Sequence, residues 1–178
     1  MKTQQVKTLV LCALFAALTA VCSQIQIPLP MIPINLALFA VLLCGALTSK
    51  SKAALAMAVY MLMGVIGLPV FTGLRGGAGV LFGRTGGYIL GYVAAAFLTS
   101  FILERWGKAY WKMCLAMAAG TAGCYAFGTA WFMVLTGSGL WTSLTVCVFP
   151  FLIGDAVKIL LAALLAGRLE KPLRKVLA

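Results

Sequence analysis

The stretch "FPFLIGDAVKILLAALLAG" (149–167) indicates a membrane-spanning helix, because it is apolar and long enough to cross a lipid bilayer. A bilayer-spanning helix needs ~20 mostly apolar residues. This stretch nevertheless carries a carboxylate and an ammonium group, Asp155 and Lys158. Insertion of an ionisable group into such a segment costs about 2.5–3.5 kcal/mol. The pair therefore needs a structural or a functional reason.

The whole chain shares this apolar character. Of its 178 residues, 63% are hydrophobic, and its mean hydropathy is +1.09, whereas a soluble domain is roughly half apolar. The remaining polar surface is too small to cover a water-soluble globule. The sequence therefore predicts an all-α integral membrane protein, with one domain over residues 1–178.

Hydropathy divides the chain into six candidate membrane-spanning helices. They are expected near 6–26, 33–49, 52–67, 85–104, 111–136 and 143–167. The first resembles a secretory signal peptide, with lysines ahead of an apolar run. Val21 before Cys22 does not fit a lipoprotein cleavage site, so we expect this helix to be retained.

Two apolar connections are not expected to be helical throughout. One is "IQIPLPMIPIN" (25–35), whose three prolines interrupt a helix. The other is the glycine-rich "GLPVFTGLRGGAGVLFG" (67–83). Irregular backbone at membrane depth is tolerated only where it is buried in protein or lines a cavity. These segments are therefore the first candidates for the walls and lid of a pocket.

The net charge of +11 comes from 14 basic and 3 acidic residues. In a soluble protein this balance would suggest nucleic acid, but here the basic residues form clusters between apolar runs, so we expect no nucleic-acid partner. On the far side of the predicted bundle the loops carry only Arg75 and Arg84. The near side carries Lys2, Lys7, Lys50, Lys52, Arg105, Lys108, Lys112, Arg168, Lys171, Arg174 and Lys175. This asymmetry predicts that both termini are cytoplasmic.

Several chemistries are excluded or disfavoured. The chain has no His, and its six cysteines lie in apolar runs without CxxC spacing, so a metal site is not expected. The GxxxxGK[ST] phosphate loop is absent. With only three acidic residues, little is left for acid–base catalysis. We expect neither an enzyme nor a bound cofactor, and the cysteines are interpreted as small packing residues.

Asp155 and Lys158 lie i,i+3 on one helix face, where they can pair. The pair is either a structural lock or a polar ligand site, since intramembrane charges usually serve function. Arg84 opens "RTGGYILGY", and an Arg beside a helix N-terminus suits a carboxylate, although it could also extend to lipid headgroups. Tyr88 follows one turn later and could stack on a ligand or belong to the interfacial aromatic belt. Asn35 either caps the second helix or contacts ligand.

Small residues recur at four-residue spacing and allow helix backbones to approach closely. In the first helix these are Ala13 with Ala17 and Ala16 with Ala20. Similar stripes are Gly83, Gly87 and Gly91, and Ala116, Gly120, Cys124 and Gly128. Each stripe is interpreted either as packing inside the chain or as a docking face for another membrane protein.

Three ordered motifs resemble the BioY family, which is the biotin-binding S component of energy-coupling factor (ECF) transporters. They are "IPLPMIPINL" (27–36), "GVIGLPVFTGLRGGAGVLFGRTGGYILGY" (64–92) and "PFLIGDAVKILLAALLA" (150–166). The resemblance implies the six-helix S-component fold in a bacterial cell membrane, with one biotin bound near the outer face.

The resemblance also implies site residues. The GDxxK motif supplies Asp155 and Lys158 as polar contacts, and the GLPVF motif supplies Phe71 as apolar cover. The TGGY motif supplies Gly86, Gly87 and Tyr88 as pocket wall. Biotin carries ureido N–H groups and a carbonyl, an apolar bicycle and a carboxylate tail. Asp155 could accept from N–H and Lys158 could donate to oxygen, with Arg84 a candidate for the carboxylate.

The implied partners are a transmembrane coupling protein and two ABC ATPases, which would consume ATP to reorient the loaded bundle. In the family, helix one docks through the Ala-x-x-x-Ala spacing that Ala13, Ala16, Ala17 and Ala20 match. Three alternatives stay open: an S component for another vitamin, a self-contained proton-coupled carrier with Asp155 as relay, and a scaffold subunit without a ligand.

Overall fold

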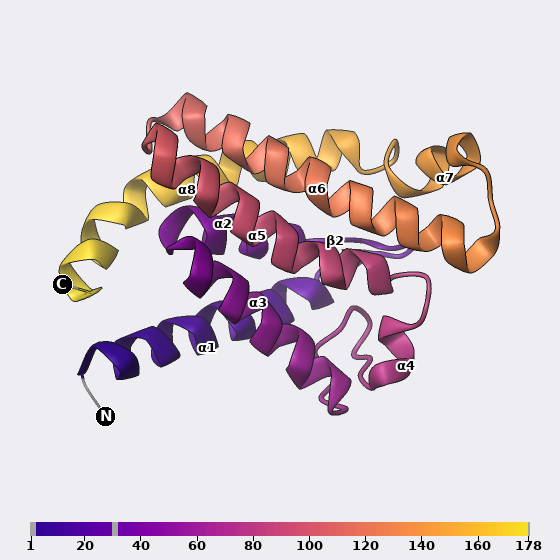
Figure 1. Cartoon of the computed structure of the whole chain (residues 1–178), viewed down its shortest axis with the longest axis horizontal. Coiled ribbons are helices and arrows are strands. Elements are labelled where there is room, and N and C mark those ends of the chain that lie inside the picture. Colours follow the sequence, from indigo (N-terminus) through magenta and orange to yellow (C-terminus); the bar gives the residue numbers. More distant parts are fainter. Residues whose placement is uncertain (1–2, 30–31, 178) are drawn as a thin grey trace.

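The apolar segments fold into helices in the order that hydropathy predicts (Figure 1). The computed structural model describes residues 3–29 and 32–177. The helices are α1 (Thr3–Gln24), α2 (Ala37–Leu47), α3 (Lys50–Val65), α4 (Ala78–Leu81), α5 (Gly86–Trp106), α6 (Tyr110–Thr136), α7 (Leu140–Cys147) and α8 (Leu152–Leu177). A short antiparallel pair, β1 (Gln26–Ile27) with β2 (Ile34–Asn35), joins α1 to α2.

The helices differ in whether they are long enough to span a membrane. Among the described residues, three helices are long and apolar enough to cross a bilayer: α1, α5 and α6. Helices α7 and α8 meet the test only together, and they are bent by 52°. Helices α2 and α3 are shorter than a full span. The expected helix over 33–49 is therefore present in part, whereas the short helix expected near 52–67 is present as α3.

The expected single helix over 143–167 is wrong. The chain leaves helical geometry at Val148 (φ −126°, ψ −57°) and resumes it at Leu152. The cause is Pro150, which has no backbone N–H and disfavours helical dihedrals at the residue before it. Beyond the expected end at 167, α8 continues to Leu177.

Helix α2 is the centre of the bundle. It packs against α1, α5 and α8, and nine of its eleven residues are buried. At 1.5 Å per residue it spans about 16 Å, roughly half of a bilayer core. The β1–β2 hairpin occupies the segment before it, because Pro28 and Pro33 keep that backbone extended. The sequence analysis expected a loop here and missed the strand pairing.

Helices α5 and α6 form the longest close contact, and glycines make it possible. A methyl group at Gly120 would lie 2.3 Å from the Thr99 hydroxyl and 2.8 Å from the Ala95 carbonyl oxygen. One at Gly91 would lie 3.0 Å from the Cys124 carbonyl oxygen. These small-residue stripes therefore serve packing inside the chain.

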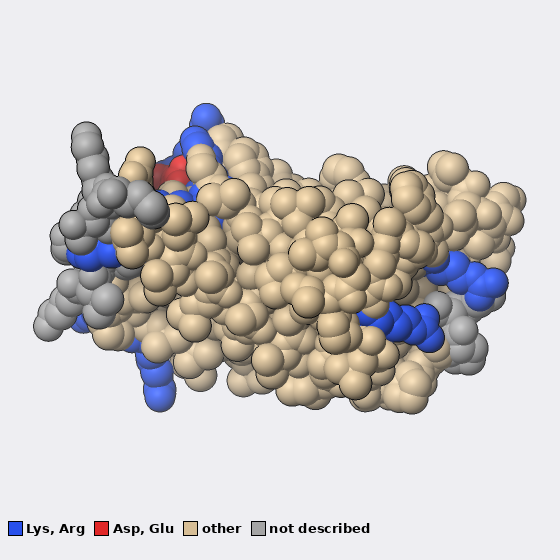
Figure 2. Space-filling view, turned by 90° about the horizontal axis from the view of Figure 1, so that it is seen from below, with Lys and Arg blue, Asp and Glu red and all other residues tan. Residues whose placement is uncertain are grey.

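The two ends of the bundle differ. Helix α1 begins and α8 ends at the same end of the molecule, while α4 and α7 lie at the opposite end (Figure 1). On the face in Figure 2, Lys and Arg lie toward both ends, and the broad band between them shows no charged side chain. The six cysteines are unpaired thiols and five of them are buried, in agreement with their interpretation as packing residues.

Candidate functional site

A cavity of about 560 Å³ opens among the irregular segments and the helices that they cover. This volume lies in the usual range for small-molecule sites. Six residues predicted for the site line it: Asn35, Phe71, Arg84, Tyr88, Asp155 and Lys158. They come from the hairpin, the 67–83 loop, the start of α5 and the start of α8, so the fold gathers residues that are far apart in sequence.

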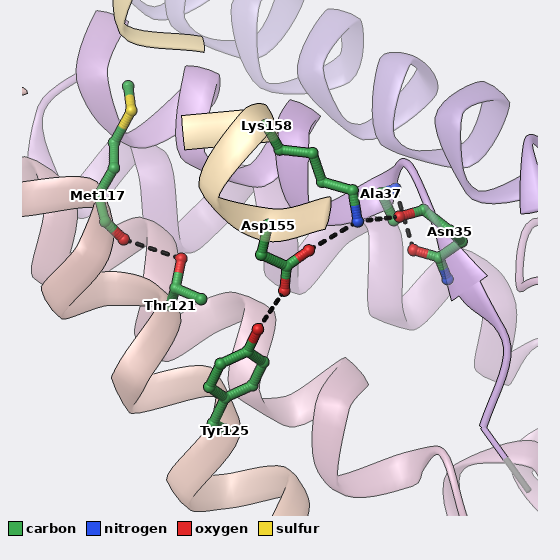
Figure 3. Close-up of polar contacts among 7 residues, drawn as sticks. All are labelled: Asn35, Ala37, Met117, Thr121, Tyr125, Asp155 and Lys158. Carbon is green, nitrogen blue, oxygen red and sulfur yellow. Dashed lines mark hydrogen bonds and ion pairs between the residues drawn. The ribbon is translucent and has the colours of Figure 1, made fainter. Parts of the chain in front are cut away.

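The buried charged pair lines this cavity, and Figure 3 shows its polar contacts. The Lys158 Nζ donates to Asp155 Oδ1 at 2.7 Å and to the Asn35 carbonyl oxygen at 2.6 Å. The Tyr125 hydroxyl donates to Asp155 Oδ2 at 2.5 Å. Asp155 is 3% exposed and Lys158 is 8% exposed. Both carboxylate oxygens therefore have donors, which offsets part of the cost of burial.

The break before α8 explains where Asp155 lies. Because α8 begins at Leu152, Asp155 falls in its first turn, and its N–H bonds to the Phe151 carbonyl oxygen. The positive end of the helix dipole favours a carboxylate there. The sequence analysis placed Asp155 inside a continuous helix, where no such stabilisation exists.

Asn35 connects three parts of the site. Its Oδ1 accepts from the Ala37 N–H at 3.0 Å, at the start of α2, and its Nδ2 donates to the Thr72 hydroxyl at 2.7 Å. Its carbonyl oxygen accepts from Lys158. The expected capping role is present, and Asn35 also lines the cavity. Both of the roles left open by the sequence are therefore available to it.

Aromatic rings form the apolar walls. Phe71 is 2% exposed and meets Tyr60 edge to face with ring centroids 5.7 Å apart. A methyl group at Gly64 would lie 2.0 Å from the Phe71 ring, so only glycine fits beneath it. Tyr88 packs beside Phe151, and its hydroxyl donates to the Cys147 carbonyl oxygen. Tyr88 therefore offers a ligand its ring rather than its hydroxyl.

Gly86 and Gly87 are not among the residues that line the cavity. A methyl group at Gly86 would lie 1.6 Å from the Leu81 carbonyl oxygen, and one at Gly87 would lie 2.3 Å from Trp131 Cβ. The two glycines act behind the wall, where they let the 67–83 loop and α6 approach the start of α5.

Positive charge predominates in the cavity. Its lining includes Lys158, Arg75 and Arg84 but only one carboxylate, Asp155. Both arginines are also exposed to the outside. Arg75 was expected only in a loop on the far side of the bundle, and the structure places it on the cavity lining as well. Such a lining attracts a ligand that carries a negative group.

Sequence reasoning missed Tyr125, Tyr60 and Thr72 as cavity residues. Tyr125 had a usable signal, because a Tyr hydroxyl inside an apolar helix needs a hydrogen-bond partner. Thr72 had none, since its place depends on the course of the loop.

The four alanines of α1 face different directions. Ala13 and Ala17 are exposed, whereas Ala16 is fully buried and Ala20 is partly buried. Ala13 and Ala17 are therefore the pair accessible to another protein. Among the described residues, no group of three or more His, Cys, Asp or Glu side chains could hold a metal ion.

The family model for the BioY family matches residues 1–175. The chain belongs to the BioY family. A biotin transporter BioY from Thermotoga maritima is 36% identical over 168 residues, covering 93% of this chain and 96% of that protein. A probable biotin transporter BioY from Pyrococcus horikoshii is 34% identical over 170 residues, covering 96% of this chain and 98% of that protein.

The fold comparison agrees with the BioY assignment. The crystal structure of the S-component for biotin from an ECF-type ABC transporter superposes with a TM-score of 0.88 at 26% identity. The match covers 96% of this chain and 94% of that structure. The resemblance stated from the motifs is thereby confirmed. Because the family's named members are transporters, the expectation that this chain is not an enzyme is confirmed as well.

Proposed function

We propose that this chain is the biotin-binding membrane subunit of an ECF-type transporter. The observation that carries the proposal is the cavity, which combines a buried Asp–Lys pair with two arginines and aromatic walls. The names of its relatives support biotin as the ligand. The chain needs no cofactor of its own.

The chemistry of the cavity suits the parts of biotin. Asp155 accepts from the ureido N–H groups, and Lys158 donates to the ureido carbonyl oxygen. The bicycle and the alkyl tail lie among Phe71, Tyr88 and their neighbours. Arg84 binds the carboxylate, and Arg75 also lines the cavity. This orientation gives each polar group of the ligand a partner of opposite character.

Transport requires partners that supply energy. We propose a transmembrane coupling protein that docks on the exposed Ala13 and Ala17 of α1, and two ABC ATPases that hydrolyse ATP. The chain would cross a bacterial cell membrane six times, with α7 and α8 as one broken crossing and both termini cytoplasmic. The concentration of basic residues at the terminal end supports this orientation.

The decisive experiment is equilibrium binding of biotin to the detergent-purified chain after endogenous ligand has been removed. We expect saturable binding at one site that thiamine and riboflavin do not compete. Competition by either vitamin would indicate an S component for another substrate. A folded chain that binds none of the three would overturn the proposal and leave the Asp155–Lys158 pair as a structural lock.

A further inference from the structure

The 67–83 loop contains a tight turn that covers the cavity, here called the covering turn (70–75). Phe71 and Arg75 exchange backbone hydrogen bonds at 2.9 and 3.2 Å. Four of the six residues of this turn line the cavity: Phe71, Thr72, Gly73 and Arg75. The position of the covering turn therefore sets how closed the cavity is.

The covering turn is strained. Leu74 has a φ of +55°, in the left-handed region, which costs a residue with a side chain roughly 1–2 kcal/mol. Leu74 is also largely exposed, so burial of its side chain does not offset that cost. A conformation of this kind persists where neighbouring groups hold it.

The end of α1 supplies that hold through Ser23 and Gln24. Gln24 Nε2 lies 3.3 Å from the Val70 carbonyl oxygen and 3.2 Å from the Phe71 carbonyl oxygen. It also lies 2.8 Å from Ser23 Oγ and 3.2 Å from the Ala20 carbonyl oxygen of its own helix. Gln24 Oε1 accepts from the Leu74 N–H at 2.9 Å. The Ser23 hydroxyl donates to the Val70 carbonyl oxygen at 2.7 Å. One amide side chain thus bridges both sides of the covering turn.

The primary amide of Gln24 meets two opposite demands. The Leu74 N–H can only donate and the two carbonyl oxygens can only accept, so the side chain must offer one acceptor and one donor. A glutamate would keep the bond to Leu74 and lose the donor. A methionine of similar length would lose both.

The other side of the covering turn is held differently. The Thr72 hydroxyl accepts from Asn35 Nδ2, and the Asn35 carbonyl oxygen accepts from Lys158. This second anchor runs through a residue proposed to contact ligand, so ligand binding can alter it. The Gln24 anchor is independent of the charged pair.

We propose that Gln24 is a positioning residue that holds the covering turn closed over the cavity and sets how fast a bound ligand leaves. This inference rests on the proposed function for the identity of the ligand. It does not rest on that function for the hold itself, which the hydrogen bonds of Gln24 supply.

The test compares Gln24→Met with Gln5→Met in the full-length, detergent-purified chain. Gln5 is an exposed residue at the other end of the same helix, so it controls for the substitution. Two quantities are measured: the release rate of labelled biotin into excess unlabelled biotin, and hydrogen exchange of the Leu74 amide without ligand. We expect Gln24→Met to raise both by about tenfold, the worth of one to two net hydrogen bonds, and Gln5→Met to change neither.

A third variant distinguishes the acceptor oxygen of the Gln24 amide from its NH2 donor. Gln24→Glu should keep the Leu74 amide protected and still speed biotin release, because only the bonds to the carbonyl oxygens are lost. Release within twofold of the unmodified chain in Gln24→Met would overturn the inference. Unchanged exchange at Leu74 in that variant would overturn it too. If the unmodified chain binds no biotin, the proposed function fails, while the exchange measurement still decides whether Gln24 holds the turn.

Discussion

Two helix pairs of this protein differ in continuity: one is unbroken and closely packed, and the other is interrupted and carries a buried charge. Helices α5 and α6 run unbroken beside each other, and glycines bring their backbones together. Helices α7 and α8 are separated by a break at Pro150, and α8 begins with a buried carboxylate in its first turn. The first pair is a rigid scaffold. In the α7–α8 pair the helix is interrupted, so that Asp155 lies at a helix N-terminus. The helix dipole stabilises its carboxylate there, as the middle of a continuous helix would not.

The largest expected effect comes from removing one member of the charged pair in α8. Lys158→Met leaves Asp155 buried without its cation, which typically costs about 3–5 kcal/mol. We expect biotin binding to fall by at least about a hundredfold, because the variant loses the ammonium that donates to the ligand and leaves Asp155 without the cation that positions its carboxylate. Isothermal titration of the purified variant measures the affinity, and thermal unfolding measures the stability.

The double variant Asp155→Leu with Lys158→Met sharpens this result. It removes both charges, so stability should recover toward that of the unmodified chain, while binding stays lost. Recovery of binding together with stability would mean that the pair only locks the structure.

The second-largest expected loss of affinity comes from removing the Tyr125 hydroxyl, which links α6 to α8 through its hydrogen bond to Asp155. Tyr125→Phe removes one donor from Asp155, and a hydrogen bond to a charged group is worth about 1.5–3 kcal/mol. We expect biotin affinity to fall by about tenfold or more. Tyr110→Phe is the matched control, because its hydroxyl is exposed, donates to the Leu160 carbonyl oxygen at 3.4 Å and is not part of the cavity lining. Equal losses in the two variants would contradict the role of Tyr125.

The scaffold itself is tested at a glycine away from the cavity. Gly120→Ala forces a methyl group against Thr99 and Ala95, and such overpacking costs about 1–3 kcal/mol. Gly167→Ala in α8 meets nothing within 4 Å, so it should be neutral or stabilise by about 0.5–1 kcal/mol through helix propensity. Thermal unfolding in detergent compares them. A Gly120→Ala variant as stable as the unmodified chain would show that the α5–α6 contact tolerates separation.

The contrast between the helix pairs also explains what the sequence could predict. The apolar runs gave the order of the helices, but small-residue spacing left open whether the stripes pack inside the chain. Asp155, Lys158 and Arg84 were predicted for the site because charges are conspicuous in an apolar chain, and Phe71 came from the family resemblance. The break at Pro150 was not predicted, because a hydropathy profile measures only how apolar a segment is. It does not register that proline lacks the backbone N–H that a continuous helix needs. The roles of Thr72 and Gln24 depend on loop geometry, which no local pattern encodes.

The smallest expected effect belongs to the exposed side of the cavity. Arg75 lines the cavity but is solvent-exposed, so its attraction for a carboxylate is screened by salt. Arg75→Gln should slow biotin association by about two- to threefold at low ionic strength, because steering charges act mainly on association. The difference should vanish near 1 M salt, where the screening length is about 3 Å. Stopped-flow binding at both salt concentrations measures it. A defect that persists in high salt would mean that Arg75 contacts the ligand directly, and the polar site would then extend from the first turn of α8 to the covering turn.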